Sequence, residues 1–163
     1  MAETLVQPDK LSDSQSEYMK LIAEIMEIRK RGEKPLAYIR TYGCQQNVAD
    51  SEKIKGMLSD SGFDFADSPD NADFILFNTC AVREHAEDRV FGNVGALKNL
   101  KRKHPQILIA LCGCMMEQEH VANRIYKSFP FVGLVFGTHS LHHFPELMYN
   151  SLVNGKRVFE RGN

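Results

Sequence analysis

The sequence predicts an α/β fold in which helices cover both faces of a parallel sheet. Short, almost wholly apolar segments such as DFILFN (73–78) and ILIALC (107–112) are typical of strands buried on both faces. Helical segments separate these strands along the chain, and this alternation favours right-handed βαβ units. With 163 residues and a hydrophobic content of 43%, the chain suits one domain with its own core.

The first predicted element is an amphipathic helix over residues 15–31, which follows a disordered tail over residues 1–14. Gly32 is a natural stop for this helix. Residues 15–34 therefore form an N-terminal helix and linker, and the main domain is expected over 35–163. The apolar residues of the helix recur at the spacing of one helix face: Tyr18, Leu21, Ile22, Ile25 and Met26.

Strands and helices alternate in the expected main domain, and glycine or proline marks several of their boundaries. The five predicted strands span 36–41, 63–66, 73–78, 107–112 and 131–136. The predicted helices span 48–61, 83–103, 117–128 and 140–154; Pro145 could divide the last, and residues 156–160 could begin a further strand. We expect the flavodoxin-like strand order 2-1-3-4-5.

The four cysteines all lie at or just past the carboxyl end of a predicted strand. Cys44, Cys80 and Cys114 follow the first, third and fourth strands, which are neighbours in the expected order, whereas Cys112 closes the fourth strand and should point into the core. Neighbouring strands are about 4.8 Å apart, so the three loop thiols can converge on one site. The alternative is that the cysteines are small buried hydrophobes.

Soft thiolates favour zinc or iron–sulfur clusters as the occupant of such a site. Structural zinc is usually held by four ligands, often in CxxC pairs, and the sequence has no CxxC pair. Three thiolates on three loops better suit a cubane with one open iron. Gln45, Gln46 and Asn47 could donate hydrogen bonds to cluster sulfurs, or Asn47 could cap the following helix.

Three motifs in order give a resemblance to a known family: TYGCQQNVADSE (41–52), FNTCAVRE (77–84) and GCM (113–115). They are similar to the cysteine motifs of the methylthiotransferase family, over residues 36–160. The resemblance implies that Cys44, Cys80 and Cys114 each ligate one iron of an auxiliary [4Fe–4S] cluster, whose open iron would hold the sulfur to be delivered. The first two motifs look most like the tRNA branch, which converts N6-dimethylallyladenosine to its 2-methylthio form.

The resemblance also implies a radical S-adenosylmethionine domain, which binds S-adenosylmethionine and a second [4Fe–4S] cluster through CxxxCxxC, and a C-terminal RNA-binding domain. The sequence contains no CxxxCxxC, so we expect both domains to be absent from this chain. The transferase activity would then belong to a full-length enzyme, and the 163 residues alone would be inactive. The competing hypothesis is a flavodoxin-like binding or regulatory module with a thiolate zinc site or no metal.

The charge of the chain bears on its partners. Its formal net charge is −1, whereas nucleic-acid binders usually carry a basic excess, so we expect only weak tRNA binding outside the full-length enzyme. The basic stretch 98–104 is either a solvated helix end or a contact to tRNA phosphates. A sulfur donor or iron–sulfur assembly proteins are further possible partners. Because the sequence has no secretory signal and no apolar run of about 20 residues, we expect a cytoplasmic protein without membrane contact.

Overall fold

Within the part of the chain that the structure describes, the sheet is parallel and has six strands. The computed structural model describes residues 8–80 and 86–160. The strand order is β2-β1-β3-β4-β5-β6, and every neighbouring pair is parallel. The strands are β1 (Leu36–Thr41), β2 (Asp64–Phe65), β3 (Phe74–Thr79), β4 (Leu108–Gly113), β5 (Leu134–Phe136) and β6 (Val158–Glu160). The predicted flavodoxin-like class is confirmed. The predicted count of five strands is wrong because β6 adds a sixth, which is the further strand that the sequence indicated as possible over residues 156–160.

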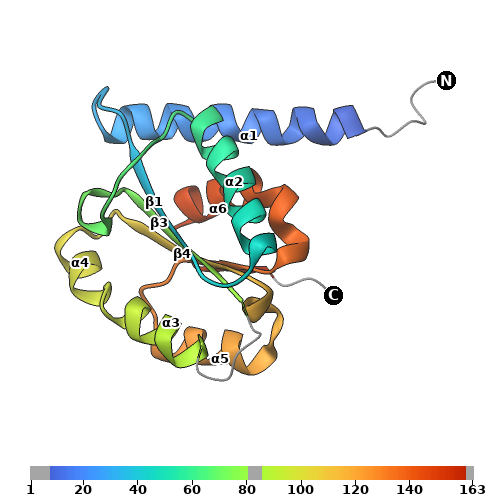
Figure 1. The fold of residues 1–163 in the computed structure, drawn as a ribbon. Helices are drawn as coiled ribbons and strands as arrows, with labels where there is room; N and C mark the ends of the chain where they lie inside the picture. The colour runs from blue at the N-terminus through green and yellow to red at the C-terminus, as the bar shows by residue number, and fades with distance from the viewer. Residues whose placement is uncertain (1–7, 81–85, 161–163) are drawn as a thin grey trace.

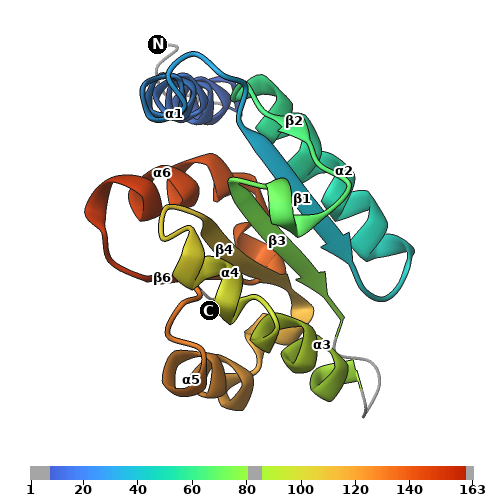
Figure 2. The ribbon, with the colours of Figure 1, turned by 90° about the vertical axis from the view of Figure 1, so that its left-hand side faces the viewer.

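Helices cover both faces of this sheet (Figures 1 and 2). On one face lie α1 (Pro8–Arg29), α2 (Gln45–Asp60) and α6 (Phe144–Asn154), which share a hydrophobic core with the sheet. On the other lie α3 (Ala86–Gly95), α4 (Lys98–Lys103) and α5 (Glu119–Ser128), which share a second core. Along β3, Phe74 and Leu76 face the first core and Ile75 and Phe77 the second, as alternation along a strand requires.

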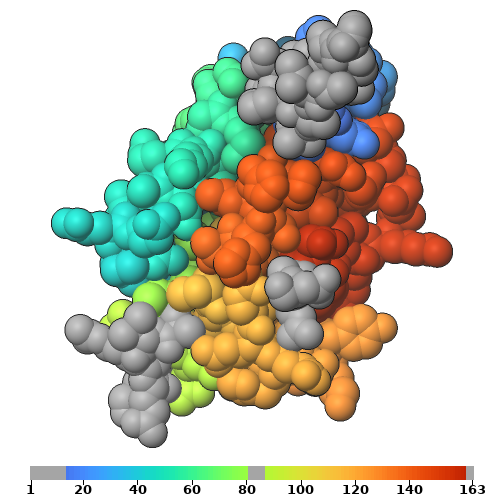
Figure 3. Space-filling model, turned by 90° about the vertical axis from the view of Figure 1, so that its right-hand side faces the viewer, coloured from blue at the N-terminus to red at the C-terminus, as the bar shows by residue number. Residues whose placement is uncertain are grey.

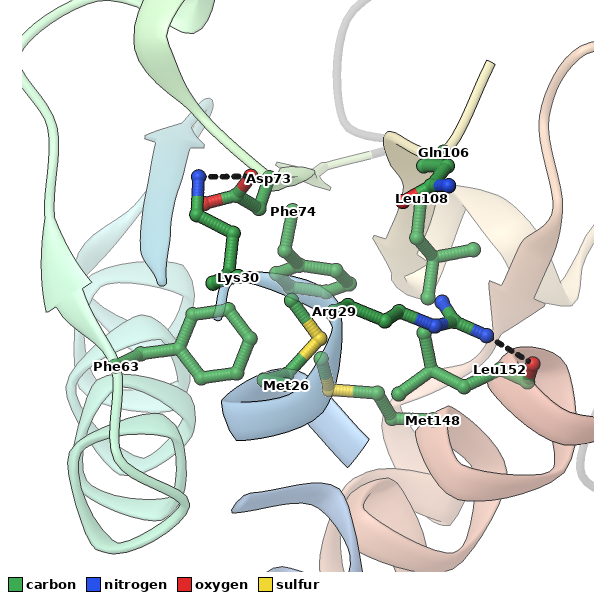
Figure 4. A pocket seen from close by; sticks show the side chains of 10 residues that line it. All are labelled: Met26, Arg29, Lys30, Phe63, Asp73, Phe74, Gln106, Leu108, Met148 and Leu152. Carbon is green, nitrogen blue, oxygen red and sulfur yellow. Dashed lines mark hydrogen bonds and ion pairs between the residues drawn. The ribbon is translucent and has the colours of Figure 1, made fainter. Parts of the chain in front are cut away.

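Helix α1 is docked on the domain rather than held away from it. It begins at Pro8, so residues 8–14, predicted as part of a disordered tail, are helical, and residues 1–7 lie outside the described chain. Near its end, Arg29 Nη2 donates to the carbonyl oxygen of Leu152 at 3.0 Å and Lys30 Nζ pairs with Asp73 Oδ1 at 3.1 Å (Figure 4). Met26 packs between these contacts against Phe74 and Met148. Tertiary packing therefore stabilises this helix.

The sequence predicts one continuous helix over residues 83–103, and this prediction is wrong because the helix is broken. The chain forms α3 and α4 with a turn between them at Ala96 and Leu97, and the predicted start at residue 83 lies outside the described residues. Gly95 is a weak helix former, and the turn places Leu97 in the second core, where it is 5% exposed. The burial of Leu97 in the second core therefore favours a break at this point over one continuous helix.

Short 3-10 turns replace the first residues of two other predicted helices, those over 117–128 and 140–154. The turn η3 (Cys114–Glu117) precedes α5, and the turn η4 (Thr138–His143) precedes α6. Pro145 lies in the first turn of α6, where its missing N–H has no helical partner to lose, so the predicted division of this segment is confirmed. Among the described residues, no helix is both long and apolar enough to cross a membrane.

Candidate metal centre

The three loop cysteines lie together at the carboxyl edge of the central strands. Cys44 immediately precedes α2, Cys80 follows the last residue of β3, and Cys114 follows the last residue of β4. The register pairs Thr41 with Asn78 and Thr79 with Gly113, so β1, β3 and β4 end at the same level. Figure 3 looks onto this face of the molecule, where the start of α2 (teal) and the region of η3 (yellow-orange) both reach the surface.

Direct contacts bring the three loops against one another. The Cys44 and Cys80 side chains interact, and a Cβ atom on Gly43 would overlap Cys80 Cβ and lie 3.1 Å from Cys80 Sγ. The Cys114 thiol points to the carbonyl oxygen of Thr79, at 3.9 Å from its Sγ. Cys44 and Cys114 are exposed, whereas Cys80 is buried. The site is therefore a thiol-lined surface whose floor is Cys80.

Cys112 does not belong to this surface. Its side chain lies in the core shared with α1, α2 and α6, at 2% exposure, as the sequence predicts for a residue that closes a strand. Burial raises the pKa of the Cys112 thiol, and the Asp50 carboxylate raises it further. Cys112 therefore stays protonated at neutral pH and is a poor metal ligand.

The geometry of the thiols bears on what the site could hold. Within the described residues, no three His, Cys, Asp or Glu side chains are grouped as they would be around one metal ion. Ligands of a cubane need not converge on one point, because each thiolate binds a different iron at a different corner. Three thiols on separate adjoining loops fit that donor set, and Cys44, Cys80 and Cys114 are the residues that could hold it.

Cys44 has the electrostatic environment of a ready ligand. It is the N-cap of α2, and the backbone N–H groups of Asn47 and Gln46 hydrogen-bond its sulfur and lower the pKa of its thiol. The positive end of the helix dipole favours the thiolate in the same sense. Metal binding requires the thiolate, so the start of α2 prepares this ligand before any metal arrives.

These opposite environments predict that the cysteines differ in reactivity. A lowered pKa increases the thiolate fraction of exposed Cys44 near neutral pH, while burial and a raised pKa protect Cys112. In metal-free protein, iodoacetamide should therefore modify Cys44 first and leave Cys112 unmodified, as peptide mass spectrometry would measure. The advantage of Cys44 over an exposed model thiol should shrink as the pH rises above the ordinary thiol pKa. Equal rates for Cys44 and Cys112 in the folded protein would contradict this assignment.

The residues that follow Cys44 lie in the first turn of α2 rather than in a loop. Cys44, not Asn47, is the N-cap; Asn47 is 5% exposed, and its Oδ1 accepts from the Cys44 backbone N–H at 3.3 Å as one half of a capping box. Gln46 Nε2 instead donates to Asp50 Oδ1 at 2.9 Å, and Gln45 is exposed. Gly43 and Gly113 both have positive φ, 105° and 109°, which lets the chain turn sharply before Cys44 and Cys114.

The basic stretch that the sequence offered as a tRNA contact lies elsewhere. Helix α4 ends just before β4 begins, at the amino edge of the sheet, opposite the cysteines (Figure 1). Lys101 Nζ donates to the carbonyl oxygens of Pro105 and Ile107, both at 2.6 Å. This lysine therefore stabilises the turn into β4, and the structure does not bring the basic stretch to the thiols.

Comparison with known proteins links this arrangement to a family. The profile described as uncharacterized protein family UPF0004 matches residues 36–137. Three relatives are named tRNA-2-methylthio-N(6)-dimethylallyladenosine synthase. The one from Clostridium perfringens is 48% identical over 135 residues, which are 83% of this chain and 30% of the relative. The one from Caldicellulosiruptor saccharolyticus is 51% identical over 131 residues, 80% and 28% of the two chains, and the one from Clostridium tetani is 49% identical over 130 residues, 80% and 29%.

The similarity is high but covers less than a third of these relatives' length. The matched segment starts at the first residue of β1 and ends directly after β5, so it contains the three cysteine-bearing loops at the carboxyl edge. The chain therefore belongs to this family, the N-terminal domain of the methylthiotransferases, and is similar to members that are named as tRNA methylthio synthases.

Proposed function

We propose that this chain is the N-terminal part of a tRNA methylthiotransferase that converts N6-dimethylallyladenosine beside the anticodon to its 2-methylthio form. Within that enzyme, Cys44, Cys80 and Cys114 would hold an auxiliary [4Fe–4S] cluster. The observation that carries the proposal is that three neighbouring strands end at the same level and that the loops after them, each with one cysteine, pack against one another at the carboxyl edge of the sheet. The names of the relatives support the tRNA substrate.

The residues of this chain would prepare the site in distinct ways. Each of the three thiolates would bind one iron, which leaves one iron open, and the bound cluster would present there the sulfur to be transferred. Hydrogen bonds from the backbone N–H groups of Asn47 and Gln46 lower the pKa of the Cys44 thiol, so this residue would give up its proton to a metal more readily than an ordinary cysteine. Cys80 would supply a buried thiolate, and Cys114 would supply an exposed one from the segment directly after β4.

Metal reconstitution tests this proposal against its competitor. Purified chain, treated anaerobically with ferrous iron and sulfide, should gain sulfur-to-iron charge-transfer absorption and bind about four irons and four sulfides per chain. A chain that takes up zinc tightly but no sulfide would support the competing flavodoxin-like module with a thiolate zinc site. A chain that binds neither iron with sulfide nor zinc would support the version of that module that holds no metal. Either of these two results would overturn the cluster proposal.

Catalysis and tight tRNA binding would both need the rest of the full-length enzyme. The target carbon of the adenine is unactivated, so its substitution by sulfur calls for radical chemistry that a cofactor carries. The 163 residues contain no CxxxCxxC for a second [4Fe–4S] cluster or for S-adenosylmethionine, and their net charge is −1. With dithionite and S-adenosylmethionine, the reconstituted chain should therefore form no 5′-deoxyadenosine above a protein-free control. Production that rises with the amount of chain would contradict this division of roles.

The same proposal covers compartment and further partners. A tRNA substrate and thiols that must stay reduced are both compatible with the cytoplasm. A sulfur donor or iron–sulfur assembly proteins would load the exposed Cys44 and Cys114. Cell fractionation and crosslinking with sulfur-carrier proteins would test these two expectations, and recovery of the chain outside the cytoplasm would count against the first.

A further inference from the structure

A buried network of side-chain amides and hydroxyls lies directly beneath the three cysteine loops. Its centre is the pair Asn47 on α2 and Asn78 on β3, which are 5% and 1% exposed. Neither asparagine is a ligand in the proposed cluster site, whose ligands are Cys44, Cys80 and Cys114. Buried polar groups of this kind are costly unless every donor and acceptor is satisfied, so their arrangement specifies a single local structure.

The two asparagines bind each other reciprocally. Asn47 Nδ2 donates to Asn78 Oδ1 and to the carbonyl oxygen of Thr79, both at 3.0 Å. Asn78 Nδ2 donates to the carbonyl oxygen of Asn47 and to Ser51 Oγ, both at 2.9 Å. Ser51 Oγ is in turn 2.7 Å from Thr41 Oγ1 on β1. These bonds join the first turns of α2 to the ends of two strands.

The Asn47 amide also bonds the Cys44 loop and the carbonyl before Cys80, and it shares that carbonyl with Cys114. Its Oδ1 accepts from the Cys44 backbone N–H and from Cys44 Sγ, both at 3.3 Å, so all four hydrogen-bonding positions of the amide are used. The Thr79 carbonyl, which accepts from Asn47 Nδ2, directly precedes Cys80 and is also the group to which Cys114 Sγ points. One amide therefore connects the loops of Cys44, Cys80 and Cys114.

Two glycines show how closely the loops press on this network. A Cβ atom on Gly43 would lie 2.8 Å from Asn47 Oδ1, and one on Gly113 would lie 2.9 Å from Asn78 Oδ1. Both distances are too short for a carbon atom beside an oxygen, so the cysteine loops can pack here only because they carry glycine. Glycine at these two positions therefore fixes how closely the cysteine loops approach the asparagine pair.

We propose that Asn47 and Asn78 are positioning residues that set the relative places of the three thiols before a cluster binds. Asn47 acts on the thiols directly through the Cys44 loop and the Thr79 carbonyl, and Asn78 acts through Asn47. The neutral amide also serves the site better than a carboxylate, because a negative charge beside Cys44 would oppose an anionic thiolate cluster. This inference rests on the proposed cluster site.

The test compares Asn47→Ala with the wild type and with Gln45→Ala. Alanine is a good helix former, but Asn47→Ala removes the buried hydrogen bonds of this amide, so the free energy of unfolding should fall. Circular dichroism and a thermal melt of the metal-free protein would check that the variant still folds. Partners that orient metal ligands typically contribute about 10–100-fold to metal affinity. We therefore expect Asn47→Ala to lose iron to a chelator about 10–100-fold faster than the wild type and to change the electron paramagnetic resonance line shape of the reduced cluster. Gln45→Ala, an exposed neighbour of Cys44, should behave as the wild type.

A double-mutant cycle separates the role of Asn78. If Asn78 acts through Asn47, the double variant of Asn47→Ala and Asn78→Ala should lose iron about as fast as Asn47→Ala alone, so the two effects should not add. Additive effects would overturn the coupling between the two asparagines. An equal effect of Gln45→Ala would show that side chains near the sulfurs act by direct donation, which would also overturn the inference.

The outcome for the wild type separates this inference from the proposed function. If the wild type binds iron and sulfide but Asn47→Ala retains them with the same kinetics and line shape, only the positioning role fails. If the wild type binds no iron and sulfide under the same conditions, the proposed function fails and this inference fails with it. A variant that unfolds is replaced by Asn47→Ser, for which the same loss of retention is expected and full retention would overturn the positioning role.

Discussion

Alanine in place of Cys44, Cys80 or Cys114 should each abolish stable cluster binding, whereas Cys112→Ala should leave it intact. The three cysteine loops adjoin one another at the carboxyl edge of the sheet, while the Cys112 side chain lies in the core with a raised pKa. A cubane held by two protein ligands would have two open irons and would exchange rapidly with chelators. Iron and sulfide per chain after reconstitution, with the charge-transfer absorption, would measure the loss.

Cys112→Ala is the matched control because it also removes a cysteine sulfur, from a position two residues before Cys114. It removes one buried sulfur from the core, which should lower the free energy of unfolding by about 1 kcal/mol without affecting iron content. Full cluster retention in any one of the three loop variants would remove that cysteine from the ligand set. Loss of the cluster in Cys112→Ala, with the fold intact, would bring Cys112 into it.

The placement of these cysteines could be predicted because it depends on chain order alone. Buried strands are recognisable as apolar segments, and right-handed crossovers restrict their order, so the strands before Cys44, Cys80 and Cys114 become neighbours. The structure has this order and places Cys112 in the core, as expected. That the three thiols hold a cluster stays a prediction.

The sequence indicates the sixth strand less clearly than the other five because tertiary contacts stabilise it. β6 has three residues and is only partly buried. Immediately before it, Arg157 donates to the carbonyl oxygens of Tyr126, Phe129 and Val132, with N–O distances of 2.8 to 3.0 Å. These acceptors lie around the end of α5, about thirty positions earlier in the chain. No local pattern near residue 158 records such a contact, and a three-residue segment has little periodicity of its own.

The same limit applies to the network under the site. From the sequence alone, Asn47 could be a helix cap or a hydrogen-bond donor to cluster sulfurs, and the sequence does not decide between these two roles. Its partner Asn78 is 31 positions away, and only the pairing of β1 with β3 shows that the two amides meet. Thr79, which reads as a strand residue, contributes a carbonyl oxygen that no side-chain pattern encodes.

Gly113→Ala should be the most destabilising single-methyl substitution in the site. Gly113 has φ 109° and ψ 177°, a region that is essentially restricted to glycine. An added Cβ would overlap the carbonyl oxygen of Thr79 and lie 2.7 Å from its backbone nitrogen, and both atoms belong to the neighbouring strand. The backbone strain costs about 1–3 kcal/mol, and crowding of a packed interior costs about as much again. The free energy of unfolding should therefore fall by about 2–6 kcal/mol.

Gly56→Ala in α2 is the control that separates this strain from the general effect of adding a methyl group. A Cβ on Gly56 would meet no atom within 4 Å, and the position is in a helix interior. Alanine there should raise the free energy of unfolding by about 0.5–1 kcal/mol, because glycine loses more backbone entropy on folding. Urea denaturation of the metal-free proteins, followed by circular dichroism, measures both changes with opposite signs expected.

The consequence for the site follows from what Gly113 touches. The Thr79 carbonyl that the new methyl group would displace accepts from Asn47 Nδ2 and lies opposite Cys114 Sγ. Any Gly113→Ala protein that still folds must therefore move Cys114 and Cys80 apart or give up an Asn47 hydrogen bond, and either change weakens a cluster held by both thiols. A Gly113→Ala variant that matched the wild type in stability and in cluster retention would contradict both the positive φ at residue 113 and the close packing of the two loops on which the site depends.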